Sequence, residues 1–282
     1  MKNYVSINKK IKNFKSKINV DGDKSLSIRF SILASLAIGN SRANNLLMSE
    51  DVISALNCLK KLGVKIKLKK KYCEIIGNGL NSYVYKNNLT LNAGNSGTTA
   101  RLIASTLISS PKEIKITGDY SLRKRDMKRI IEPLQKFGAT FKKNKGTLPL
   151  KIKGSDYIRP INYVDNKYAS AQTKTAVLIC GLFAPGITKL KCLPSRNHTE
   201  IIYKKVLKLP IKIKKTRKFD YIELKGKRNF KSLVYNIPGD PSSSAFFVVL
   251  TLLSKNSNLI IKNICANPYR IGYITILNKM GA

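Results

Sequence analysis

A repeat with a period of 73 residues is the feature that most restricts the fold of this chain. Four segments share one design, in which a turn of small and polar residues leads into an apolar helix. They read GDKSLSIRFSILASLAIG, GNSGTTARLIASTLI, YASAQTKTAVLICGL and PGDPSSSAFFVVLTLL. Ser25, Thr98, Ala171 and Ser244 hold equivalent places, each 73 positions after the previous one. A period this long is typical of a small α/β module used several times.

A second series of features repeats with a similar period. Amphipathic segments end at 62–63, 137–138 and 280–281, each time at a glycine that suits a helix C-terminus, and a degenerate copy lies near Leu209-Pro210. A strand then follows and ends at a further glycine, which is Gly77, Gly154 or Gly226. Each module is therefore predicted to hold two helices and several strands. After Gly281 the pattern requires another strand, so the sequence is interpreted as a fragment.

Charge and composition narrow the classes of function. The formal net charge is +38, with 42 lysines against 11 arginines, and the lysines are spread along the chain. We interpret most of them as solvated faces, with an attraction for anions as the alternative. A basic nucleic-acid-binding protein remains a rival hypothesis, although no recognition motif supports it. The apolar runs are too short for a membrane span. Five scattered cysteines without CxxC spacing and a single histidine predict neither disulfides nor a metal site.

The repeated turns are candidate anion sites, because helix N-termini present unpaired N–H groups and partial positive charge. Basic residues fall beside them, a cluster of cations spans 123–129, and the loop 194–200 adds Arg196 and the only histidine, His198. Together they suggest a ligand with more than one phosphate or carboxylate. The structural alternatives are that the turns are only helix caps, that the 123–129 cluster is a solvated face, and that His198 is a loop residue.

These residues resemble the enolpyruvyl transferase family, and within it the EPSP synthases (3-phosphoshikimate 1-carboxyvinyltransferases). The resemblance runs from about Asn19 to the end of the chain. It rests on VDGDKSLSIR, LNAGNSGTTARL, GDYSLRKRDMKRIIEPLQKFGA, YASAQTKTAVLICGL, SRNHTE and PGDPSSSAFF. The sequence departs from the family pattern at 20–21, at Asp126 and at Leu209-Pro210, which puts local loop geometry in doubt.

The resemblance implies an α/β fold of repeated βαβαββ-like units, the inside-out α/β barrel of the enolpyruvyl transferases. The family has two lobes of three units each. Residues 22–237 are expected to form one complete lobe. Residues 1–21 and 238–282 are expected to begin a second, incomplete lobe.

The resemblance also implies an activity: transfer of the enolpyruvyl group of phosphoenolpyruvate to the 5-hydroxyl of shikimate 3-phosphate, with release of phosphate. This is a cofactor-free transferase reaction of the shikimate pathway in aromatic amino-acid biosynthesis. Lys24 is expected to contact both substrates and to assist proton transfer. For shikimate 3-phosphate the implied residues are Ser25, Arg29, Ser170, Gln172, Ser195 and Arg196. For phosphoenolpyruvate they are Gly97, Arg125 and Gln172, and the supporting residues are Asn95, Thr98, Arg101 and Lys174.

Further expectations follow from the resemblance. The complete protein is expected to be a cytoplasmic monomer, with no metal, no nucleic acid and no membrane partner, and Gly97 is expected to leave room for glyphosate. The family's proposed Asp base lies in the second lobe, so the 282-residue chain alone is expected to be inactive or nearly so.

Two alternative identities remain. One is a UDP-sugar enolpyruvyl transferase, which is disfavoured because Arg123 and Arg125 stand where a loop Cys is usual. The other is a non-catalytic relic. Residues 1–17 are interpreted as a ragged start or a remnant of a targeting segment.

Overall fold

The computed structural model describes residues 11–142 and 145–282. Residues 1–17 are interpreted as a ragged start or a targeting remnant, and the first ten of them lie outside the described residues. Contacts divide the chain into two compact units, Lys24–Ile237 and a smaller unit made of residues 11–23 with Pro238–Ala282. Each unit is considered by itself below. Among the described residues, no helix combines the length and the apolar character needed to cross a bilayer.

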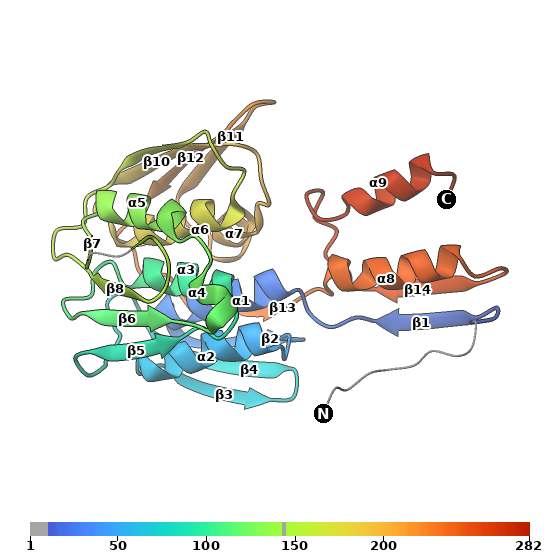
Figure 1. The fold of residues 1–282 in the computed structure, drawn as a ribbon, viewed down its shortest axis with the longest axis horizontal. Helices are drawn as coiled ribbons and strands as arrows, with labels where there is room; N and C mark the ends of the chain where they lie inside the picture. Colours follow the sequence, from blue (N-terminus) through green and yellow to red (C-terminus); the bar gives the residue numbers. More distant parts are fainter. Residues whose placement is uncertain (1–10, 143–144) are drawn as a thin grey trace. The chain divides into compact units, whose positions relative to one another are not determined.

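The larger unit repeats one module three times, and the second module shows its design most simply (Figure 1). Its elements are β5 (Leu89–Asn92), α3 (Gly97–Thr106), β6 (Ile114–Thr117), α4 (Tyr120–Arg123), α5 (Lys128–Lys136), β7 (Thr140–Phe141) and β8 (Leu150–Lys153). The sheet order is β5-β6-β8-β7. The β5–β6 pair is parallel, because α3 carries the chain back to the end of the sheet where β5 begins. The other two pairs are antiparallel.

The third module has the same topology. It comprises β9 (Asn162–Asp165), α6 (Ala171–Phe183), β10 (Ile187–Cys192), α7 (His198–Ile201), the π-helical turn η1 (Ile202–Val206), β11 (Ile211–Lys215) and β12 (Asp220–Lys225). The degenerate helix end near Leu209 is explained here. The helix stops at Val206, and Lys208 adopts φ 50°, which replaces the positive-φ glycines Gly63 and Gly138 of the other two modules. Pro210 cannot continue a helix.

In the first module, the strand that corresponds to β5 and β9 comes from the C-terminal end of the larger unit. The module contains α1 (Lys24–Leu36), β2 (Ile38–Asn44), α2 (Glu50–Lys61), β3 (Lys65–Lys69) and β4 (Tyr72–Asn78). The parallel partner of β2 is β13 (Val234–Asn236), in the sheet order β13-β2-β4-β3. The strand that directly precedes α1 in the sequence therefore does not belong to this sheet.

In the smaller unit, the corresponding strand comes from the N-terminal end of the chain. The unit contains β1 (Lys15–Asn19), α8 (Pro241–Leu252), β14 (Asn258–Lys262) and α9 (Gly272–Lys279). Although β13 precedes α8 in the sequence, the strand parallel to β14 is β1. Where the two chain segments cross, Asp23 N donates to Pro238 O at 2.8 Å and Asp240 N donates to Asp21 O at 2.9 Å.

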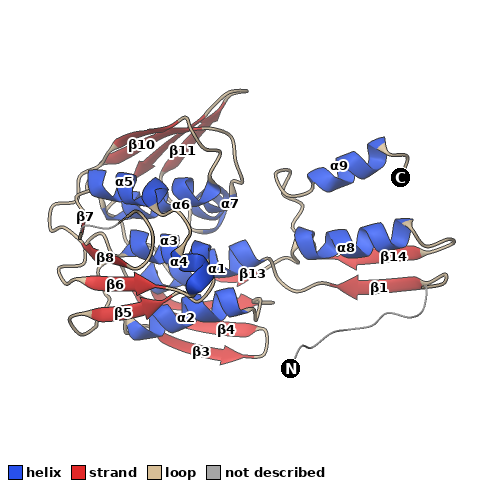
Figure 2. Cartoon of the chain, viewed as in Figure 1, coloured by secondary structure: helices blue, strands red, loops and turns tan. Residues whose placement is uncertain are grey.

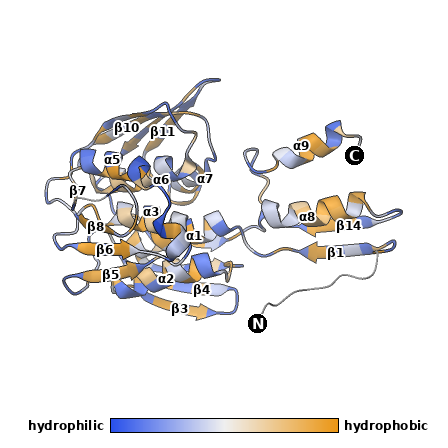
Figure 3. Ribbon diagram, viewed as in Figure 1, coloured by the Kyte–Doolittle hydropathy of each residue, from blue (hydrophilic) through white to orange (hydrophobic). Residues whose placement is uncertain are grey.

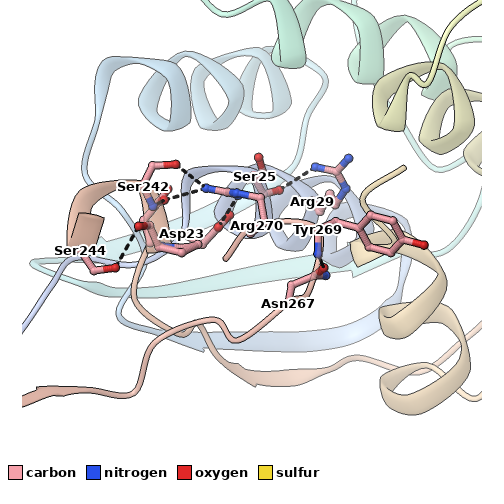
Figure 4. Close-up of polar contacts among 10 residues, drawn as sticks. Asp23, Ser25, Arg29, Ser242, Ser244, Asn267, Tyr269 and Arg270 are labelled. Atoms are coloured by element: carbon pink, nitrogen blue, oxygen red, sulfur yellow. Dashed lines mark hydrogen bonds and ion pairs between the residues drawn. The ribbon is translucent and has the colours of Figure 1, made fainter. Parts of the chain in front are cut away.

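An arginine holds this crossing together within the smaller unit (Figure 4). The Arg270 guanidinium lies 2.7 Å from an Asp23 carboxylate oxygen and 2.8 Å from one of Asp240, and it also donates to Ser242 Oγ. Asp23 is fully buried. Two carboxylates that would otherwise be costly to bury are thus paired with one planar cation.

Helices lie at the centre of the larger unit, and the sheets pack around them and add buried side chains such as Ile75, Ile116 and Leu224 (Figure 2). Nearly every residue of α1, α3 and α6 is buried, including many serines and threonines. Several of their hydroxyls donate to carbonyl oxygens of their own helix, as Ser31 does to Ser27 O and Ser105 to Arg101 O. The three strand-ending glycines pack directly on the ends of these helices. A Cβ at Gly77 would meet the carbonyl oxygens of Ala34 and Ala37, and a Cβ at Gly154 or Gly226 would likewise collide with backbone atoms. The predicted α/β fold of repeated βαβαββ units is confirmed.

Candidate functional site

The N-terminus of α3 carries the densest group of predicted site residues in the larger unit. Ser96 caps the helix by accepting from Thr99 N at 3.2 Å. Gly97 follows, and a Cβ at this position would lie 3.1 Å from Arg101 Nη1 and 3.5 Å from Arg125 Nη1. A residue without a side chain therefore opens the helix start between two guanidinium groups. Helix N–H groups and two arginines together are suited to a carboxylate or a phosphate.

Fixed partners orient Arg125 and Asn95. Arg125 Nη2 donates to Asn95 Oδ1 at 2.8 Å, and Asn95 Nδ2 donates to Asp119 Oδ2 at 2.6 Å. Asp119 also caps α4 by accepting from Leu122 N at 2.7 Å. The pKa of Asp119 is lowered, first by the backbone hydrogen bond from Leu122 and then by the one from the Asn95 amide. The ionised carboxylate thus anchors the chain that ends at Arg125.

Gln172 links α6 to α3. Its Nε2 donates to Thr98 Oγ1 at 2.8 Å, and its Oε1 accepts from Arg101 Nη1. Both ends of the amide are therefore held, which fixes the side chain at the junction of two modules. The structure thus brings together six predicted residues from two modules: Asn95, Gly97, Thr98, Arg101, Arg125 and Gln172.

The charge at this junction is strongly positive. Arg101 is 8% exposed and donates to Asp126 O at 2.9 Å, while its Nε finds no hydrogen-bond partner among the described residues. Burial lowers the pKa of Arg101, and the neighbouring charges of Arg129 and Arg125 lower it further. An arginine stays protonated at neutral pH despite such a shift. A bound anion would relieve the repulsion among the three guanidinium groups.

The N-terminus of α1 contributes a second group. Lys24 lies 3.6 Å from the Asp51 carboxylate on α2, with 47% of its side chain exposed. Asp51 O also accepts from Thr99 Oγ1 at 3.1 Å, which connects α1 to α3 through α2. Arg29 is buried and donates to Ser25 O, to Thr175 Oγ1 and to Thr199 Oγ1, at 2.9 to 3.0 Å. Arg29 thus joins α1 to α6 and α7 (Figure 4 shows its contact with Ser25).

The third group lies at α6 and the loop before α7. Ser170 caps α6 by accepting from Thr173 N at 3.2 Å. Ser195 is 8% exposed, and its Oγ has no hydrogen-bond partner among the described residues. Lys174, predicted as a supporting residue, points into the protein, where it lies 2.7 Å from Glu200 and 3.5 Å from Asp220.

Several residues of this network were not predicted from the sequence. Asp51 and Asp119 each anchor a predicted site residue, Glu200 and Asp220 neutralise Lys174, and Thr175 and Thr199 orient Arg29. The threonines and Glu200 stand inside the quoted motifs, yet nothing local distinguishes a buried partner from a surface residue. Asp51 carries no motif signal, because only the packing of α2 against α1 gives it a role.

A comparison with protein families identifies the relationship. The family model of EPSP synthase (3-phosphoshikimate 1-carboxyvinyltransferase) matches residues 8–282. The chain belongs to the EPSP synthase family.

Individual members of the EPSP synthase family support the assignment. The chain is 40% identical over 271 residues to the 3-phosphoshikimate 1-carboxyvinyltransferase of Caldicellulosiruptor saccharolyticus, covering 95% of this chain and 61% of that protein. It is 41% identical over 267 residues to the enzyme of that name from Ruthia magnifica, covering 94% of this chain and 60% of the relative. It superposes on EPSP synthase from Acinetobacter baumannii with a TM-score of 0.85 and 34% identity, covering 96% of this chain and 60% of that one. The chain thus spans about 60% of the length of these relatives.

Proposed function

We propose that this chain serves the transfer of the enolpyruvyl group from phosphoenolpyruvate to the 5-hydroxyl of shikimate 3-phosphate, the reaction after which its relatives are named. The observation that carries the proposal is the start of α3, where Gly97 lies between the guanidinium groups of Arg101 and Arg125. Two substrates with two phosphates and two carboxylates must be held together in this reaction. Fixed cations and helix N-termini lower the resulting repulsion.

Phosphoenolpyruvate would bind at the start of α3. Gly97 allows a carboxylate or phosphate to approach the helix backbone, and Arg125 is oriented toward this point by Asn95. Gln172, held by Thr98 and Arg101, would contact both substrates. Lys24 is half-exposed and would contact both substrates and assist proton transfer.

Shikimate 3-phosphate would bind across α1, α6 and the loop before α7. Ser195 supplies a buried hydroxyl without a partner among the described residues, and Arg196 follows it in the chain. Ser170 lies at the α6 N-terminus, and Ser25 follows Lys24 in the first turn of α1. Arg29 connects these elements from the side of the core, and its place in the VDGDKSLSIR motif assigns it to the same ligand.

The wider setting of the reaction belongs to the same proposal. The reaction would serve the shikimate pathway and aromatic amino-acid biosynthesis in the cytoplasm, without a cofactor, and a protein with the full length of these relatives would be a monomer. Sedimentation of such a full-length protein across a concentration series tests the monomeric state. A mass that doubles with concentration would contradict it.

Calorimetric titration of the chain with shikimate 3-phosphate tests the function. We expect saturable binding with one site per chain, and we expect UDP-N-acetylglucosamine to give no heat of binding. Arg196→Ala should weaken binding about tenfold or more, since a charged hydrogen bond to a phosphate is lost. The matched control is Lys189→Met on the exposed face of β10, whose side chain is 58% exposed and should leave the affinity unchanged. Binding of the UDP-sugar in preference to shikimate 3-phosphate would overturn the proposal.

A further inference from the structure

Lys174 is a buried cation whose surroundings do not suit ligand binding. Its side chain is 1% exposed, and its Nζ lies 2.7 Å from Glu200 Oε1 and 3.5 Å from Asp220 Oδ2. The two carboxylates outnumber the ammonium, so the cluster carries no surplus positive charge that would attract an anion. Lys174 must therefore contribute in a different way from the arginines at the start of α3.

The third contact of Lys174 reaches the backbone of the loop before α7, which carries Ser195 and Arg196. Its Nζ donates to Ser195 O at 3.3 Å. The Ser195 side chain is buried, yet its Oγ has no hydrogen-bond partner among the described residues. A buried hydroxyl without a partner is costly unless a ligand or water satisfies it. Lys174 thus binds the carbonyl oxygen of Ser195, the residue whose buried hydroxyl has no partner among the described residues.

The same cluster also fixes the far end of this loop. Glu200 on α7 contacts Lys174, and the neighbouring Thr199 accepts from Arg29 Nε at 3.0 Å and shares a hydrogen bond with Thr175 at 2.7 Å. At the near end, Cys192 pairs with Asp220 in the β10–β12 ladder. One buried cluster therefore restrains the loop at its start, its middle and its end.

The second module uses a related arrangement. Arg101 and Lys174 are 73 positions apart and so occupy equivalent places in the repeat. Arg101 Nη2 donates to Asp126 O at 2.9 Å, next to Arg125, just as Lys174 donates to Ser195 O next to Arg196. In both modules a cation on the inner helix holds a loop carbonyl whose neighbour in the chain is an arginine.

We propose that Lys174 is a positioning residue that holds the Ser195–Arg196 segment in the conformation that receives the phosphate of the substrate. This inference rests on the proposed function for the identity of the ligand. The restraint of the loop by Lys174 stands on the contacts alone. The two parts can therefore be tested separately.

The first test measures the loop without any ligand. Lys174→Met combined with Glu200→Gln removes the clamp and leaves the net charge of the cluster unchanged. The amides of Leu193 and Ile201 donate to Asp165 O and Asn197 O at the two ends of this loop. Their hydrogen exchange should become about tenfold faster or more, the effect expected for the loss of one charged hydrogen bond, while exchange in α6 stays as before. Unchanged loop exchange would overturn the proposal. Should this double variant not fold, Lys174→Arg gives the same test, because the cation is kept and the donor is displaced.

The second test measures binding of shikimate 3-phosphate by calorimetry. The double variant should bind about tenfold more weakly or worse, and adding Ser195→Ala should then cost little, because the hydroxyl is already misplaced. Lys189→Met is the control and should bind as the native chain does. Native affinity in the double variant would overturn the positioning role. So would a Ser195→Ala substitution that weakens binding by the same factor in the double variant as in the native chain. If the native chain itself does not bind shikimate 3-phosphate, the proposed function fails and the exchange measurement alone decides the role of Lys174.

Discussion

Helix α8 of the smaller unit and helices α1, α3 and α6 of the larger unit come from the same repeat but have different surroundings. In α1, all residues from Leu26 to Leu36 are buried, whereas in α8 only Pro241 and Ser244 are. Phe246 is 80% exposed and Leu253 81%. Figure 3 shows that α8 is nonetheless strongly hydrophobic. An apolar sequence is thus enough to form the helix, but neighbouring modules are needed to bury it.

The N-terminal caps, by contrast, are alike in the two units. Asp240 caps α8 by accepting from Ser242 N at 2.8 Å, just as Ser96 and Ser170 cap α3 and α6. A cap needs only residues within one turn, so it forms whether or not the helix is covered. The difference between the units is therefore one of packing, and the following variants test it.

The largest effect is expected at a repeat glycine of the larger unit. Gly226→Ala would place a Cβ against the carbonyl oxygens of Gly181 and Ala184, so we expect a loss of about 4 kcal/mol or more, enough to prevent folding of the unit. Gly272→Ala in α9 is the matched control, because no atom lies within 4 Å of its Cβ. Thermal unfolding followed by circular dichroism measures both. Equal melting temperatures for the two variants would contradict the packing described here.

The next effect concerns the buried charges of the smaller unit. Arg270→Met leaves Asp23 and Asp240 without their cation, which should cost about 3–5 kcal/mol. The loss should unfold α8, β14 and β1 and leave the larger unit folded. Hydrogen exchange across the chain distinguishes the units, with Lys262→Met on the exposed side of β14 as the control. Full protection of α8 in the Arg270 variant would show that apolar contacts alone maintain this unit.

Matched leucines compare the two kinds of helix directly. Leu33→Ala in α1 removes a side chain that is 1% exposed and should cost about 2–5 kcal/mol. Leu253→Ala at the end of α8 removes one that is 81% exposed and should change stability by less than about 0.5 kcal/mol. Urea unfolding of both variants gives the two values. A large cost at Leu253 would mean that α8 is covered in solution.

Removal of a cap should have a smaller effect. Ser96→Ala deletes the hydrogen bond to Thr99 N and should cost about 1 kcal/mol. The control is Ser121→Ala, whose side chain is exposed on α4 and does not cap it. The same urea measurement applies. A cost as large as that of Leu33→Ala would imply that caps, rather than packing, distinguish the units.

The smallest effect is a change in acid stability. The pKa of Asp119 is depressed below its usual 3.8, chiefly by the hydrogen bond from Leu122 N, so its ionised form contributes stability above that value. This contribution is lost as the pH falls through the lower folded-state pKa. Asp119→Asn should therefore flatten the acid side of the stability curve of the larger unit and leave the smaller unit unchanged. An identical acid midpoint in variant and native chain would contradict the role of Asp119.

Much of the fold was open to prediction from the sequence. The 73-residue spacing, the helix-starting turns and the strand-ending glycines identified the modules, because each depends on residues close together in the chain. The site residues at the start of α3 and α6 were found through their motifs. Their roles as ligand contacts stay predictions, and Lys174 shows why. Its motif position suggested a supporting cation, but burial beside Glu200 and Asp220 directs it to the backbone of Ser195.

By itself, the sequence determined where the repeated apolar helices begin and where several helices and strands end, through caps, periodicity and glycines that act within a few residues. Only the tertiary structure decided that β13 completes the first module and that β1 pairs with β14, because strand exchange depends on contacts between distant segments. It also decided which charges are neutralised inside the protein and which remain for a ligand. Burial and pairing are properties of the surroundings, which no local pattern of residues specifies.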